Sequence, residues 1–63
     1  SLLEQVNRLP PKYRQVLYLR YYEDYEVQEI AALLGQSPAL VSTHLARARA
    51  KLRQQLGGNC YDG

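Results

Sequence analysis

A cluster of cations lies near the end of the chain, on a stretch that contains no acidic residue. Every second residue of this cluster is basic, and its members are Arg47, Arg49, Lys51 and Arg53. Guanidinium and ammonium groups that lie together in this way bind the phosphate oxygens of nucleic acids. A charged helix face that only confers solubility usually mixes both signs, often as Glu and Lys four residues apart. The formal net charge of the chain is only +2, so the basic footprint is local and favours binding to nucleic acid.

The segment around this cluster has the periodicity of an amphipathic α-helix. Its apolar residues recur at steps of three and four, and they are Val41, Leu45, Ala48, Leu52 and Leu56. We expect this stripe to face the core and the opposite side to face solvent. The opposite side carries Ala39, Ser42, Thr43, Ala46, Arg47, Ala50 and Arg53, with His44, Arg49 and Lys51 on its flanks. Small side chains near the start, followed by arginines, suit a helix that lies in a DNA major groove.

A second helical segment precedes this one and is separated from it by a short turn. Between residues 27 and 34 the apolar positions share one side of a helix, and they are Ile30, Ala31 and Leu34. Gly35 ends this helix, because glycine adopts the left-handed conformation at a helix C-terminus without a steric penalty. Ser37 can then accept hydrogen bonds from the free N–H groups of the next helix, and Pro38 lacks an N–H where none is needed. Two helices joined in this way predict a helix-turn-helix.

Two further helices are predicted in the first third of the chain. A short amphipathic helix is built on Leu2, Leu3, Val6 and Leu9. It ends at Pro10 because the residue before a proline is pushed out of the helical region. Pro11 opens a second helix that continues through Tyr22, and Asp24 is the expected turn residue, either in a left-handed conformation or as a cap. The predicted fold class is all-α: a small four-helix domain with a C-terminal helix-turn-helix and no winged elements.

One small domain is predicted over residues 1–56, followed by a flexible and dispensable tail over residues 57–63, with three glycines and no periodicity. A chain of 63 residues buries only about 60% of its unfolded surface, so a partner or a larger parent protein is expected. The single cysteine, Cys60, cannot form an internal disulfide, and no paired Cys/His spacing indicates a metal site. Neither catalytic residues nor a cofactor, a small-molecule substrate or a membrane span is predicted. We therefore expect a cytoplasmic protein that is not an enzyme.

Six tyrosines are the only aromatic residues, and each has a polar tip that must reach water or a partner. The second helix has an apolar face that is predicted to pack in the core and comprises Tyr13, Val16, Leu17 and Tyr21. Tyr18 and Leu19 lie off this face. Because so small a core cannot cover every apolar residue, we predict an exposed patch that binds a protein partner and comprises Leu3, Val6, Tyr18 and Leu19.

Several short motifs follow one another in an order that is specific in combination. They are Leu9-Pro10, Lys12-Tyr13-Arg14, Ile30-Ala31, Leu33-Leu34-Gly35, Arg47-Ala48-Arg49 and Lys51-Leu52. This combination, within residues 2–56, resembles region 4 of bacterial RNA polymerase sigma factors, most closely the extracytoplasmic-function type. The resemblance implies that the last helix enters the major groove of the promoter −35 element and that the earlier helices hold the flap tip of the polymerase β subunit. It also makes an anti-sigma factor a candidate partner.

Carried over position by position, the resemblance implies two sets of contacts to double-stranded promoter DNA. Contacts to base edges would come from Pro38, Ala39, Ser42, Thr43 and Ala46. Contacts to the backbone would come from Lys12, Arg14, Glu26 to Gln28, Arg47 and Arg49, and position on the last helix adds His44 and Arg53. The family commonly has a basic residue where this chain has Ser42 and His44, and basic residues donate paired hydrogen bonds to guanine. Base discrimination is therefore expected to be shallow, and affinity mostly electrostatic.

Two alternative interpretations stay open. The helix-turn-helix could be the output domain of a dimeric response regulator, although the Leu9-Pro10-Pro11 start argues against it and a monomer in sedimentation would argue further. The chain could instead be a helical module that binds an anti-sigma factor or another regulator without reading DNA. Gel shifts with duplex DNA at two salt concentrations would separate these hypotheses.

Overall fold

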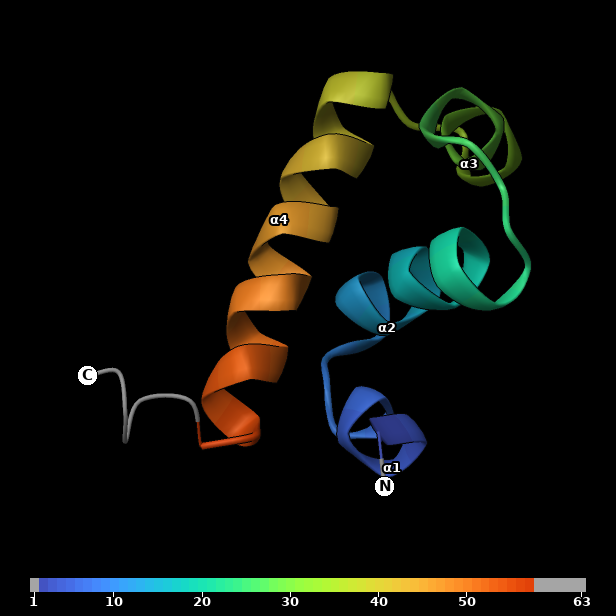
Figure 1. Ribbon diagram of the computed structural model, residues 1–63. Helices are drawn as coiled ribbons and strands as arrows, with labels where there is room; N and C mark the ends of the chain where they lie inside the picture. Colours follow the sequence, from blue (N-terminus) through green and yellow to red (C-terminus); the bar gives the residue numbers. More distant parts are fainter. Residues whose placement is uncertain (1, 58–63) are drawn as a thin grey trace.

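The computed structural model describes residues 2–57, and its regular elements there are all helical (Figure 1). They are α1 (Leu2–Asn7), α2 (Pro11–Leu17), the π-helical segment η1 (Tyr18–Tyr22), α3 (Val27–Leu34) and α4 (Pro38–Gln55). The prediction of an all-α domain of four helices with a C-terminal helix-turn-helix is confirmed. The tail predicted over residues 57–63 lies outside the described residues except for Gly57, and so does Cys60.

The longest helix, α4, runs along one side of the molecule, and the other helices pack against it (Figure 1). The start of α4 lies beside α3, its middle lies against α2, and its end lies near α1. A hydrogen bond of 2.7 Å from the Gln55 side-chain amide to the Gln5 carbonyl oxygen joins the end of α4 to α1. The chain therefore places its first and last described helices side by side, 50 residues apart in sequence.

The core lies between α2, α3 and α4. Its buried residues are Leu9, Tyr13, Val16, Leu17, Ile30, Ala31, Val41, Leu45 and Ala48. The apolar stripe predicted for α4 is confirmed from Val41 to Leu52, which packs against this core from a half-buried position. Leu56 was predicted to extend the stripe, and this is wrong, because α4 ends at Gln55 and the Leu56 side chain is 56% exposed.

The turns follow the local chemistry expected from the sequence. Gly35 has φ 68° at the end of α3, and Asp24 is also left-handed with φ 66°. The Ser37 hydroxyl accepts a hydrogen bond of 3.1 Å from the Leu40 N–H in the first turn of α4. At the start of α3, Oε1 of Glu29 accepts a hydrogen bond of 2.8 Å from the Glu26 N–H. These two hydrogen bonds cap the first turns of α4 and α3, respectively.

The second predicted helix changes geometry in its middle. After Leu17 it continues as η1, where the Glu23 N–H donates to the Tyr18 carbonyl oxygen, five residues back, at 3.0 Å. A π turn holds more residues than an α turn, so the α-helical phase defined by the buried residues of α2 ends at Leu17. Tyr21 was predicted to pack in the core, and this is wrong, because it is 60% exposed. Leu19, predicted to be exposed, is half-buried and packs against the core.

Candidate nucleic-acid interface and the adjoining groove

The outward face of α4, opposite its buried stripe, is a continuous solvent-exposed surface. It comprises Pro38, Ala39, Ser42, Thr43, Ala46, Arg47, Ala50 and Arg53, all of which are exposed. The prediction that Ser42, Thr43 and Ala46 face solvent is therefore confirmed. The first three turns of this face carry no side chain larger than threonine or proline before Arg47 is reached. A surface of this kind can approach base edges closely while the arginines behind it reach phosphates.

His44 lies differently from the other DNA-binding candidates on α4. It is half-buried, and its ring meets the Tyr13 ring edge-on, with centroids 5.7 Å apart and an interplanar angle of 79°. Its Nδ1 atom is buried and has no hydrogen-bond partner within the described part of the chain. The ammonium of Lys12 lies 5.2 Å from the centroid of the same tyrosine ring. Lys12 and His44, 32 positions apart in sequence, thus share Tyr13 as a neighbour.

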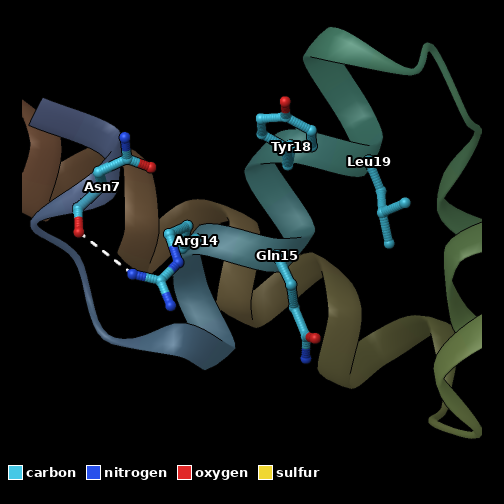
Figure 2. Close-up of a pocket in the computed structure, with 5 residues that line it drawn as sticks. All are labelled: Asn7, Arg14, Gln15, Tyr18 and Leu19. Atoms are coloured by element: carbon cyan, nitrogen blue, oxygen red, sulfur yellow. Dashed lines mark hydrogen bonds between the residues drawn. The ribbon is translucent and has the colours of Figure 1, made fainter. Parts of the chain in front are cut away.

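The remaining DNA-binding candidates come from α2 and α3. Gln28 is exposed in the first turn of α3. Arg14 is half-buried, and its Nη1 donates a hydrogen bond of 3.2 Å to the Asn7 carbonyl oxygen. Figure 2 shows Arg14 reaching across the gap between α1 and α2, beside an open hollow that is also lined by Gln15, Tyr18 and Leu19. The side chains of Tyr18 and Leu19 point in different directions there (Figure 2).

An apolar groove, referred to below as the groove, opens on one flank of α4. It has a volume of about 640 Å³ and is lined by Leu3, Val6, Leu17, Tyr18, Tyr21, Tyr22, Arg49 and Leu52. Three residues of the predicted protein-binding patch meet here, namely Leu3, Val6 and Tyr18. Leu19, the fourth, lines the hollow of Figure 2 instead. Three of the four predicted positions therefore line one groove, and the binding of a protein partner there stays a prediction.

Polar atoms in the groove are few and lie close together. Nη1 of Arg49 donates a hydrogen bond of 3.1 Å to the Tyr21 hydroxyl. The rings of Tyr18 and Tyr22 are stacked, with centroids 4.7 Å apart and an interplanar angle of 25°. Sequence analysis missed Leu17, Tyr21, Tyr22 and Leu52 as lining residues and placed Arg49 only among the DNA contacts. The one signal available was that Tyr22, like Tyr18, falls off the apolar face of α2.

Within residues 2–57 there is no group of three or more His, Cys, Asp or Glu side chains that could hold a metal ion. In the same range no helix is long and apolar enough to cross a membrane.

Comparison with known proteins identifies the family to which this chain is similar. Residues 1–52 match the protein family described as Sigma-70, region 4. The RNA polymerase sigma factor SigV of Bacillus subtilis is 38% identical over 56 residues, which make up 89% of this chain and 34% of that protein. The RNA polymerase sigma-E factor of Streptomyces coelicolor is 42% identical over 55 residues, or 87% of this chain and 31% of that protein.

A third relative, the ECF RNA polymerase sigma factor SigW of Bacillus subtilis, is 34% identical over 56 residues, or 89% of this chain and 30% of its own length. The chain therefore spans about a third of the length of these relatives. No solved structure matches it.

Proposed function

The chain belongs to the sigma-70 region 4 family, and from this premise we propose that it binds promoter DNA in transcription initiation, with α4 in the major groove of the −35 element. The observation that carries the proposal is the outward face of α4, where small exposed side chains precede arginines and no acidic residue interrupts them. This face has the shape and charge that a helix needs to lie between two phosphate backbones. Such a role belongs in the cytoplasm.

In this proposal one group of residues contacts base edges and another contacts phosphates. Base edges are contacted by Pro38, Ala39, Ser42, Thr43 and Ala46. Phosphates are contacted by Lys12, Arg14, Gln28, His44, Arg47, Arg49 and Arg53. Arg14 and Arg49 each donate a hydrogen bond within the protein, so each would have to exchange or share that bond on binding DNA. Arg47 and Arg53 have no such competing bond among the described residues, and they are the strongest phosphate candidates.

The groove supports the second part of the proposal, which is docking on the flap tip of the polymerase β subunit. Leu3 is 53% exposed and Tyr22 is 69% exposed, although both line an apolar concavity. Contiguous exposed apolar surface of this kind marks a protein-binding site. An anti-sigma factor that occupied the same groove would compete with polymerase.

The direct test of the DNA-binding proposal is fluorescence anisotropy with duplexes selected from a randomised pool, measured at two salt concentrations. Affinity should fall steeply as salt rises. Ala46→Glu places a carboxylate on the outward face and should abolish binding. Gln15→Glu adds the same charge at an exposed position of α2 away from this face and should weaken binding far less. Equal losses in the two variants, or binding that ignores salt, would overturn the assignment of α4.

A helical interaction module that does not read DNA is the second candidate function, and the groove is the observation that favours it. In that case the parent chain would bind core RNA polymerase or an anti-sigma factor, while selection from the duplex pool would yield no preferred sequence at either salt concentration.

A further inference from the structure

Among the described residues that line the groove, one is charged, and none of the others carries an opposite charge. This residue is Arg49; within residues 2–57 the other ionisable side chains that line the groove are tyrosines, and none of the lining side chains there is a carboxylate. Its guanidinium donates to the neutral hydroxyl of Tyr21 at 3.1 Å. Both side chains are exposed, so water can reach their remaining hydrogen-bonding groups in the free domain. Any occupant that fills the groove removes this water and must replace it.

We propose that the groove binds an amphipathic helix of a protein partner, and that this helix presents an Asp or Glu carboxylate to Arg49. The inference rests on the proposed docking role of the groove and specifies the chemistry of the docked segment. Leu3, Val6 and Leu52 provide the apolar floor, and a helix would place side chains at i, i+3 and i+4 against it.

The scarcity of polar atoms in the groove favours a helix over an extended strand. Apart from Arg49, the lining side chains offer three tyrosine hydroxyls and no other hydrogen-bonding group. An extended segment would bury N–H and C=O groups that need partners, whereas a helix satisfies its own backbone. There is no strand within residues 2–57 whose edge could pair with such a segment.

The need for a carboxylate follows from the desolvation of Arg49. A guanidinium that is covered and left without a counter-charge is strongly disfavoured, while a carboxylate pairs with it through two parallel hydrogen bonds. The Tyr21 hydroxyl can accept from Arg49 and donate to the same carboxylate. DNA phosphate would also neutralise Arg49, but a sugar-phosphate backbone has no apolar side chains to fill the space between Leu3 and Leu52.

The experiment is a selection from displayed helical peptides with a fixed apolar stripe and randomised flanking positions, using the intact chain as bait. Counter-selection on Leu3→Ser, an exposed position of the groove, removes peptides that bind elsewhere. We expect Asp or Glu to be enriched at one flanking position. In a selected peptide, replacing that acid by its amide should weaken binding to the parent chain about tenfold, the size of one hydrogen bond to a charged group.

The same replacement should have no effect on binding to Arg49→Gln, and the full tenfold effect should persist with Arg53→Gln, the matched control on the same helix outside the groove. Circular dichroism would confirm that both variants fold. Failure to select any helix, absence of an acidic preference, or a preference that survives Arg49→Gln would each overturn the inference. Displacement of the selected peptide by core RNA polymerase is measured separately, so an acidic preference without displacement would overturn the proposed docking partner and leave the groove chemistry standing.

Discussion

The outward face of α4 and the groove on its flank are neighbouring surfaces with opposite physical characters. The outward face is the convex side of a helix, with small exposed side chains and arginines. The groove is concave and apolar, and three tyrosines line it. Binding at the first surface should depend on charge and therefore on salt, whereas binding at the second should depend on shape and apolar burial. The two activities should be separable by salt and by mutation.

The largest expected effect is the loss of DNA binding and peptide binding together, because one core supports both surfaces. Ile30 is fully buried, and Ile30→Ala should cost about 2–5 kcal/mol through lost burial and a cavity. A domain this small has little stability to lose, so DNA binding and peptide binding should disappear together in thermal unfolding and anisotropy assays. Leu33 lies on the same helix but is 58% exposed, and Leu33→Ala should change stability by no more than about 0.5 kcal/mol. If Ile30→Ala kept one activity and lost the other, the two surfaces would not share a folding unit.

A substitution on the outward face should strengthen DNA binding and leave peptide binding in the groove unchanged. Ser42→Arg adds a donor that can make two hydrogen bonds to guanine, a contact that discriminates by about 1–3 kcal/mol. We expect tighter and more selective binding to guanine-containing duplexes, measured by anisotropy, and unchanged peptide binding in the groove. Gln15→Arg, with the same added charge away from this face, should raise affinity for all duplexes alike. An equal preference for guanine in both variants would contradict the placement of Ser42.

Removing the cap of α4 should disturb the start of the helix more than its C-terminal half. Ser37→Ala removes the acceptor of the Leu40 N–H and should cost about 1 kcal/mol. Fraying of the first turn displaces Pro38 and Ala39, which belong to the outward face, and leaves Arg49 and Leu52 three turns away. DNA binding should therefore weaken more than peptide binding at the same temperature, and Ser37→Asn, which retains a capping oxygen, should restore both. Equal losses at the two surfaces would mean that the cap acts only through global stability.

The elements of the outward face were predictable from sequence because their signals are local. Gly35, Ser37 and the stripe through Val41 each act within a few residues, and each has the expected conformation or burial. The groove was only partly predictable, because it depends on η1 and on three helices that meet far apart in sequence. No residue near Tyr21 in the sequence indicates the π turn that leaves the Tyr21 side chain outside the core. The contact between Tyr21 and Arg49 spans 28 positions and has no local signature at all.

The smallest expected effect concerns two arginines of α4 that are two positions apart. It shows whether one of them serves the outward face and the other the groove. From sequence alone, Arg47→Ala and Arg49→Ala should each lower the slope of log affinity against log salt by about 1. The structure separates them, because Arg47 lies on the outward face while Arg49 donates to the Tyr21 hydroxyl in the groove. We therefore expect the full change for Arg47→Ala and a clearly smaller one for Arg49→Ala, in anisotropy titrations with one duplex over a range of salt.

Tyr21→Phe removes the acceptor and should leave Arg49 free to reach phosphate, so in that background Arg49→Ala should change the slope more. If the two arginines behave alike in the parent chain, Arg49 exchanges the tyrosine for phosphate when DNA binds, and occupation of the groove and of the outward face would then compete for one side chain.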